Sequence, residues 1–289
     1  MIYLLLSILC STSIFIVFRS FERFKIDTFS AIVVNYLIAG SVGILISDVQ
    51  LSFTRMLQSP WSINGLILGV FFISLFYIMA TTAQKLGASV ASIANKMALV
   101  VPVVFAIVYY GDSYNLLKIA GVLVALIGIY LATVKPKVEK KSFDWKLFFI
   151  PFILFLGSGF IDTFIKYTQE YYLQESENDS KLFSSLIFIT AFCIGIVITV
   201  IRKGKGLNHL PTWLGGIALG LINYGSIYFL ILTFNNSQLE SSVVFPINNM
   251  GVVIFTTLLS YFLFQERFSV KNKLGVALSI LAILMISFS

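Results

Sequence analysis

Long apolar runs dominate this chain, and each is close to the length of about twenty residues that a helix needs to cross a lipid bilayer. Hydrocarbon offers no hydrogen-bond partners to backbone N–H and C=O groups, so a chain that crosses it must form helices or a closed barrel, and runs of this length favour helices. The sequence therefore predicts an all-α integral membrane protein with ten transmembrane helices. The ten runs cover residues 2–18, 28–47, 63–82, 88–110, 116–134, 146–167, 181–201, 213–234, 241–264 and 271–288.

The composition excludes a soluble protein and several kinds of site. Hydrophobic residues make up 58% of the chain and charged residues 11%, whereas charged residues alone form about a quarter of a soluble domain. The net charge of +7 rests on Lys and Arg in short loops, which orient a membrane protein, so we expect no nucleic-acid partner. Cys10 and Cys193 lie inside apolar runs and His209 lies in a loop, so we expect no metal, disulfide framework or cofactor. The first run lacks the basic start of a signal peptide and is expected to remain as a membrane helix.

Sequence repetition divides the chain into halves. A shift of 154 positions places residues 88–110 on 242–264 without a gap. We expect residues 1–134 to form a first five-helix repeat, residues 135–145 a charged linker, and residues 146–289 the second repeat. Because five is an odd number, the second repeat enters the membrane from the opposite side, and such inverted repeats are typical of secondary transporters. The same shift places Gln84 on Gln238, Asn95 on Asn249, and Gly121 on Gly275.

The loops that follow helices 1, 3, 5, 7 and 9 carry most of the positive charge, and we name the membrane side that holds them the odd-loop face. They contain fifteen Lys and Arg residues, against three, Arg55, Lys118 and Lys181, in the loops of the other face. The positive-inside rule then makes the odd-loop face cytoplasmic and puts both termini on the other side. We expect a multi-pass protein of the cell (inner) membrane of a bacterium, as a monomer or a homodimer.

Both repeats end in the same pattern: small residues entering a helix, a polar or proline position in mid-helix, an acidic residue after the helix, and a glycine opening the last helix. The two stretches are LGASVASIANKMALVVPVVFAIVYYGDSYNLLKIAGVLVALIGIYLATV and QLESSVVFPINNMGVVIFTTLLSYFLFQERFSVKNKLGVALSILAILMIS. They resemble the drug/metabolite transporter (DMT) superfamily, specifically its ten-helix members with two EamA-type repeats. The resemblance implies a secondary transporter that moves a small metabolite, often outward, through a central cavity between the halves.

The chain departs from the superfamily pattern in two respects. The four-helix multidrug members have a glutamate in the first helix, but residues 2–18 contain no acid, so proton coupling by that residue is not carried over. Many relatives also place both termini in the cytoplasm, opposite to the orientation that the loop charges indicate. Asp112 and Glu266 occupy the matching acidic positions, and we expect them to complement the N-termini of helices 116–134 and 271–288.

Lys96 is the first candidate site residue, because a charge near mid-helix costs about 2.5–3.5 kcal/mol unless it faces protein or water. Ser89, Ser92 and Asn95 share its face of the helix at 100° per residue. This polar stripe predicts a lysine that lines a cavity and binds a substrate carboxylate or exchanges a proton. The alternative is a lysine that extends to the membrane surface or pairs with an acid for structural reasons.

Asp162 and Lys166 lie four residues apart in the sixth run. A pair at this spacing can neutralise itself. Asp162 is also the one acid clearly within a predicted span, which makes it a candidate site for coupling to a proton or cation gradient. The alternatives are a hydrated ion pair near the helix end and a pairing of Asp162 with Lys96.

Amides at related positions in the fourth and ninth runs form a third candidate group. Asn95 and Asn249 are repeat partners, and Pro246 is a candidate hinge because it removes a backbone donor from its helix. Broken helices at repeat-related positions bind substrates in transporters, whereas amides can also simply join helices. Tyr77 and Asn223 are further candidates in the third and eighth runs. The glycine pairs Gly65 and Gly69, and Gly216 and Gly220, are interpreted as helix-packing positions.

The sequence favours a secondary carrier that alternates access to a central polar cavity, lined by Lys96, Asp162, Asn95 and Asn249. The expected substrate is a small polar or amphipathic metabolite such as an amino acid, moved outward, and the expected partners are this substrate and the bilayer. A flippase for a lipid-linked substrate, a channel and an intramembrane enzyme are the alternatives, and we expect no enzyme activity because no catalytic motif of that class is present.

Overall fold

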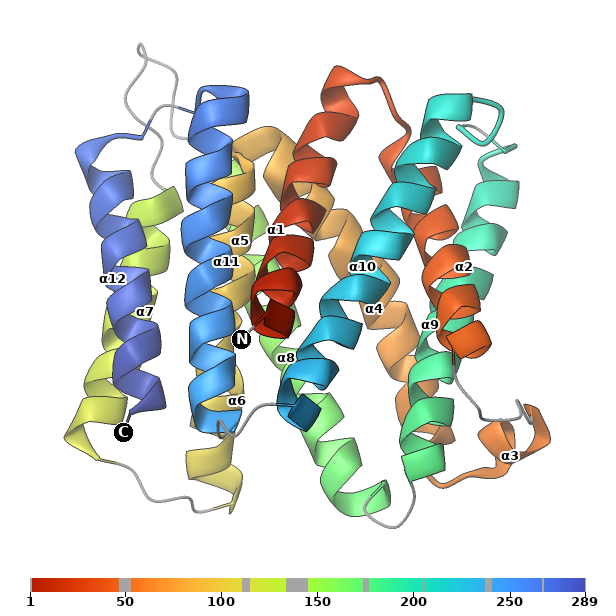
Figure 1. Cartoon of the computed structure of the whole chain (residues 1–289), viewed down its shortest axis with the longest axis horizontal. Coiled ribbons are helices and arrows are strands. Elements are labelled where there is room, and N and C mark those ends of the chain that lie inside the picture. The colour runs from red at the N-terminus through yellow and green to blue at the C-terminus, as the bar shows by residue number, and fades with distance from the viewer. Residues whose placement is uncertain are drawn as a thin grey trace. The chain divides into compact units, whose positions relative to one another are not determined.

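The computed structural model describes residues 2–46, 53–110, 115–133, 145–173, 177–204, 206–236, 241–266 and 268–288, and all regular structure in these ranges is helical. This agrees with the predicted all-α class. The elements (Figure 1) are α1 Ile2–Arg23, α2 Thr28–Ile46, α3 Phe53–Gln58, α4 Ser62–Leu86, α5 Ala88–Lys96, a 3₁₀ turn Met97–Leu99, α6 Val100–Phe105, a π-helical turn Ala106–Tyr110, α7 Leu116–Thr133, α8 Trp145–Tyr172, α9 Glu177–Ile201, α10 Leu210–Asn236, α11 Ser241–Phe264 and α12 Val270–Ser287.

Seven of the described helical segments are long and apolar enough to cross a membrane, and two shorter apolar helices, Thr28–Val42 and Leu116–Ala132, accompany them. This confirms a multi-pass membrane protein, while the count of ten spans stays a prediction. The seven segments are Ile2–Arg23, Ser62–Leu86, Ala88–Tyr109, Phe149–Thr168, Leu182–Ile201, Leu210–Leu230 and Ile247–Phe264.

The described chain divides into two compact units, and each unit draws on both halves of the sequence. Unit 1 contains Met1–Ser20, Ile78–Gly159 and Gly225–Ser289, and unit 2 contains Phe21–Tyr77 and Phe160–Tyr224. The spatial units therefore do not coincide with the predicted repeats, whose boundaries stay a prediction.

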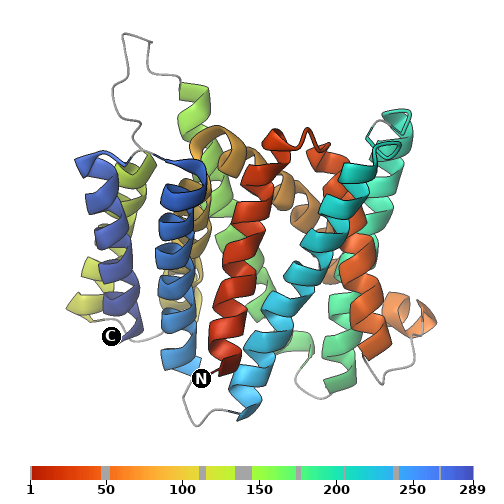
Figure 2. The same ribbon diagram turned by 45° about the horizontal axis from the view of Figure 1, so that its top comes forward.

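In unit 1, α7 and α12 lie side by side (Figures 1 and 2) and contact each other at repeat-related positions. A Cβ atom on Gly275 would lie 2.4 Å from the backbone N of Ala132, and one on Gly121 would lie 2.8 Å from Cγ1 of Ile286. The shift of 154 positions aligns Gly121 with Gly275 and Ala132 with Ile286. The two contacts are therefore reciprocal, as two inverted repeats require.

A buried apolar cluster surrounds this helix pair and extends to α5, α8 and α11. Its largest fully buried members include Ile93, Met97 and Ile283. Small residues such as Ala125 and Ala282, both 0% exposed, allow the helices to approach closely.

In unit 2, the two glycine pairs act as the sequence analysis interprets them. Gly69 on α4 faces Thr190 on α9, whose Cβ would lie 2.5 Å from a Cβ added at the glycine. Gly216 on α10 faces Val34 on α2, whose Cβ would again lie 2.5 Å away. The third helix of each repeat, α4 or α10, thus packs on the second helix of the other repeat, α9 or α2. The contacts are reciprocal, as they are in unit 1.

The fourth apolar run, expected as one helix over residues 88–110, is interrupted in the structure. α5 ends at Lys96, a 3₁₀ turn follows at Met97–Leu99, and a π-helical turn occupies residues 106–110. Pro102 gives a physical reason for the interruption, because it has no N–H to donate to the carbonyl four residues earlier. By contrast, α11, the corresponding helix of the second repeat, is described as one helix. The side chain of Pro246 lies outside the described residues, so its role as a hinge stays a prediction.

Candidate functional site

The interruption of the fourth run follows directly after two candidate site residues. Asn95 and Lys96 are the last residues of α5, and both are half-buried. Ser89 and Ser92, on the same helix, are 1% and 0% exposed. The four residues of the predicted polar stripe therefore lie on one helix, and the last of them is the last residue of α5.

Asn95 joins α5 to α8. Its side-chain amide donates a hydrogen bond to the hydroxyl oxygen of Ser158, with 2.9 Å between the two atoms. Ser158 is 6% exposed, so the bond lies inside unit 1. A neutral amide-hydroxyl pair at this depth either joins helices or offers polar groups to a ligand.

A second amide-hydroxyl contact joins α1 to α11. The hydroxyl of Ser7 lies 3.2 Å from Oδ1 of Asn248 and 2.9 Å from the carbonyl oxygen of Ser226, and one O–H is shared between the two acceptors. Ser7 and Asn248 are almost completely buried. The sequence shift pairs Asn95 with Asn249, but in the structure the neighbouring Asn248 makes the reciprocal contact.

These two contacts follow the symmetry of inverted repeats. In each, the first helix of one repeat supplies a serine and the fourth helix of the other repeat supplies an asparagine. Ser7 and Ser158 are not separated by the shift of 154 positions, so the sequence alignment does not predict that these two serines make related contacts. Asn249 is half-buried, and its role in a site stays a prediction.

The two serines of α5 have partners of different kinds. The hydroxyl of Ser92 donates to the carbonyl oxygen of Ser89 at 2.9 Å. The hydroxyls of Ser89 and Thr257 lie 2.9 Å apart, which joins α5 to α11. Ser92 is therefore satisfied within its own helix, whereas Ser89 connects two repeat-related helices.

A carboxylate that the sequence analysis assigned to another helix lies at the start of α5. Oε1 of Glu266 accepts a hydrogen bond from the backbone N–H of Ala88 at 3.0 Å and lies 3.8 Å from Nε of Arg19. The expectation that Glu266 complements the helix at 271–288 is therefore wrong. That helix, α12, is capped by Ser269, whose hydroxyl accepts from the backbone of Asn272.

Burial raises the pKa of Glu266, while the Ala88 N–H and the positive charge of Arg19 act in the opposite direction. The net pKa is above its ordinary value, because loss of hydration destabilises the charged form more than these partners stabilise it. Asp112, the matching residue of the first repeat, lies outside the described residues.

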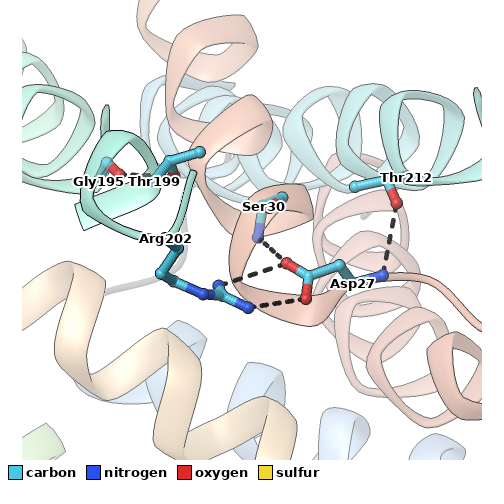
Figure 3. A network of polar contacts seen from close by, with 6 residues as sticks. All are labelled: Asp27, Ser30, Gly195, Thr199, Arg202 and Thr212. Carbon is cyan, nitrogen blue, oxygen red and sulfur yellow. Dashed lines mark hydrogen bonds and ion pairs between the residues drawn. The ribbon is translucent and has the colours of Figure 1, made fainter. Parts of the chain in front are cut away.

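In unit 2, a polar network connects the loop before α2 to the end of α9 (Figure 3). Oδ2 of Asp27 lies 3.0 Å from Nη2 of Arg202, and Oδ1 accepts from the backbone N–H of Ser30 at 2.9 Å. The backbone N–H of Asp27 donates to the hydroxyl of Thr212 at 3.4 Å. Burial raises the pKa of Asp27, but the hydrogen bonds from Ser30 and the charge of Arg202 outweigh it, so the pKa lies below its ordinary value.

A second ion pair of unit 2 joins α3 to the start of α9. Nη2 of Arg55, on α3, lies 2.7 Å from Oδ1 of Asp179 in the first turn of α9. Asp27 and Arg202 lie after the first and the seventh predicted runs, and Arg55 and Asp179 lie after the second and the sixth. Each pair therefore joins segments that alternating membrane crossings place on the same side of the membrane.

Comparison with known proteins decides the class of the chain. The model of the EamA-like transporter family matches residues 1–134 and 147–288. The chain belongs to the EamA-like transporter family. An uncharacterised protein of Haemophilus influenzae is 27% identical over 287 residues, and this match covers 97% of the chain and 95% of the relative. A solved crystal structure with a TM-score of 0.61 and 13% sequence identity covers 96% of this chain and 95% of its own, so the two share a fold.

The family match confirms the resemblance that the repeat ends indicate, and it makes this EamA-like protein a multi-pass membrane transporter. In the described part of the chain, no group of three or more His, Cys, Asp or Glu side chains could hold a metal ion.

The remaining predicted site residues of this EamA-like protein belong to unit 2. Asp162 and Lys166 are exposed on α8, and Lys96 belongs to unit 1, so a pairing of Lys96 with Asp162 stays a prediction. The amide of Asn223 donates to Oδ1 of Asn35 at 3.2 Å. Tyr77 packs edge-on against Phe29, with 6.0 Å between ring centroids.

Proposed function

We propose that this protein is a secondary transporter whose substrate site is built around the end of α5 in unit 1. The observation that carries the proposal is the change from α-helix to a 3₁₀ turn directly after Asn95 and Lys96. Interrupted membrane helices supply ligand-binding groups in secondary transporters, because their backbone and polar side chains are not fully used within the helix. Membership of the EamA-like transporter family supports the same function.

The substrate class follows from the chemistry of the side chains at this point. The ammonium group of Lys96 attracts an anion, and a carboxylate is the anion that small metabolites most commonly carry. Asn95 and Ser158 are neutral groups that both donate and accept hydrogen bonds. The apolar cluster that contains Met97 and Ile93 adjoins them. This combination favours a small amphipathic carboxylate such as an amino acid. Outward transport by alternating access is the part of the proposal that rests on the family.

Flux into proteoliposomes tests the proposal. Purified protein is screened with radiolabelled amino acids and related carboxylates, with and without a proton gradient. We expect saturable uptake of at least one compound, and loss of that uptake in Lys96→Ala and Asn95→Ala. Ser74→Ala serves as a control, because the Ser74 hydroxyl donates to the carbonyl of Val70 within α4 and is removed from α5 in sequence and unit. Wild-type flux in both α5 variants would contradict the assignment of the site.

Asp162 provides the test of coupling. If its carboxylate couples transport to a proton gradient, Asp162→Asn retains exchange between internal and external substrate but no longer accumulates substrate against a gradient. Accumulation by Asp162→Asn equal to that of the wild type would remove Asp162 from the proposal.

A further inference from the structure

Three segments of unit 1 that are distant in the sequence meet at Glu266. Its carboxylate accepts from the backbone N–H of Ala88, the first residue of α5, and faces the guanidinium of Arg19 near the end of α1. Glu266 itself follows the last residue of α11, Phe264, by two positions, and the Arg19 guanidinium lies 5.9 Å from the centroid of the Phe264 ring. A single carboxylate therefore links α1, α5 and α11.

The backbone between α4 and α5 is shaped to receive this carboxylate. Gly87 has a φ of 109°, a conformation that side-chain-bearing residues rarely adopt. A Cβ atom at Gly87 would lie 2.7 Å from both carboxylate oxygens of Glu266. The glycine thus provides both the turn and the space that Glu266 occupies. A negative charge at this position is also favourable because the N-terminus of a helix carries partial positive charge.

Arg19 extends the same cluster to α4. Its guanidinium donates to the backbone carbonyl of Gln84, and the Gln84 side chain donates to the backbone carbonyl of Phe18 at 3.2 Å. At the next residue of α5, the hydroxyls of Ser89 and Thr257 join α5 to α11. The contacts of Glu266 therefore fasten the end of the helix whose other end carries Asn95 and Lys96.

Arg19 lies near the end of α1, Gly87 lies between α4 and α5, and Glu266 follows α11. The loops that follow the first, third and ninth predicted runs are on the odd-loop face, so the contacts of Glu266 lie at this face. We propose that Glu266 is a positioning residue that latches α1, α5 and α11 together at the odd-loop face and that this latch opens when the transporter exposes its site to that side. The proposal deepens the proposed function, because it identifies the contact that controls access to the α5 site from one side of the membrane.

The experiment measures access without any transported substrate. Cys10 and Cys193 are replaced by alanine, and Ser92→Cys supplies a reporter thiol at a position that is 0% exposed, one turn inside α5. A membrane-impermeant maleimide labels the reporter in right-side-out and in inverted vesicles. Glu266→Gln preserves the shape of the side chain and an acceptor for the Ala88 N–H, but removes the attraction to Arg19.

We expect Glu266→Gln to raise the labelling rate about tenfold, and only from the odd-loop face. A tenfold change in the open fraction corresponds to about 1.4 kcal/mol. Gly87→Ala, which places a methyl group against the same carboxylate, should raise labelling from the same face. Thermal stability in detergent, measured for each variant, shows that the labelled protein is folded.

Asp27→Asn is the matched control. Asp27 is also an acid in an odd loop, accepts from a backbone N–H and pairs with an arginine, but it lies in unit 2. It should leave the labelling rate unchanged. Unchanged labelling in folded Glu266→Gln, labelling from the opposite face, or an equal increase in Asp27→Asn would each overturn the latch. Absence of flux in the wild type would instead reject the proposed function, because the labelling result does not depend on substrate.

Discussion

The close contact between α7 and α12 predicts that Gly275→Ala destabilises the protein more than alanine at Gly121 or Gly225. The added Cβ would lie 2.4 Å from the backbone N and 2.8 Å from Cα of Ala132, and 2.9 Å from the carbonyl oxygen of Gly128. All three atoms belong to backbone, so no side-chain rotation can relieve the contact. An ordinary contact distance of about 3.4 Å requires the helices to separate by roughly 1 Å, and forced expansion of a packed core typically costs about 1–3 kcal/mol.

Two other glycines serve as comparisons. Gly121 is the repeat partner of Gly275, but its nearest neighbour is a side-chain atom, Cγ1 of Ile286, at 2.8 Å. Ile286 can shift, so Gly121→Ala should cost less. At Gly225 the nearest atom is Sγ of Cys10 at 3.3 Å, and alanine there should cost less than at Gly275, because the neighbour is a side-chain atom and alanine favours helix by about 1 kcal/mol over glycine.

Thermal unfolding in a mild detergent, followed by size-exclusion chromatography, ranks the three variants. A loss of 1 kcal/mol lowers the Tm of a chain of about 250 residues by roughly 2–4 °C, so Gly275→Ala should unfold several degrees below Gly225→Ala, with Gly121→Ala between them. Equal Tm values for Gly275→Ala and Gly225→Ala would refute the reasoning, since the backbone contact would then not resist the added methyl group.

Other predictions concern the ion pairs of unit 2. Asp27→Asn should lower the Tm at neutral pH by an amount equivalent to at most about 1 kcal/mol, because the pair with Arg202 is partly exposed. Because the pKa of Asp27 is lower in the folded than in the unfolded state, its contribution is present above the unfolded pKa of about 4 and disappears as the pH falls through the folded value; Tm measured against pH should therefore converge for variant and wild type in acid. Arg55→Asp should lower the Tm, and Asp179→Arg in the same chain should restore part of the loss; no recovery in the double variant would show that the 2.7 Å contact is not a stabilising pair.

The membrane class and the duplication could be predicted from the sequence, because both depend on features that are local or periodic. Apolar runs report on the bilayer whatever their tertiary contacts. The shift of 154 positions that aligns Gly121 with Gly275 also predicts their reciprocal contacts with Ile286 and Ala132. With inverted repeats, a contact between two residues therefore implies a second contact between their repeat partners.

The candidate site could be predicted only in part. Asn95 follows from the alignment, but its partner Ser158 does not, because the first helices of the two repeats match weakly. The alignment pairs Asn95 with Asn249, whereas Asn248 makes the reciprocal contact, and a shift of one residue moves a side chain by 100° around a helix. The break after Lys96 was also missed, although Pro102 was visible in the sequence, because apolar composition dominated the interpretation of residues 88–110.

Glu266 shows a different limit of sequence analysis. From its position after α11, Glu266 was expected to interact with the next helix in the sequence, at 271–288. Its carboxylate instead accepts a hydrogen bond from the backbone N–H of Ala88, which is 178 residues away. Gly87, with its positive φ, was the available signal, because a glycine directly before a helix leaves room for another side chain.

Exchange flux tests the central claim, that inverted repeats form a carrier with its site at the end of α5. Proteoliposomes are loaded with a transported compound and diluted into buffer that contains or lacks the same compound. We expect saturable efflux that is accelerated by external compound in the wild type and is lost in Lys96→Ala. Efflux that rises linearly with concentration, is unaffected by external compound and persists in Lys96→Ala would contradict it.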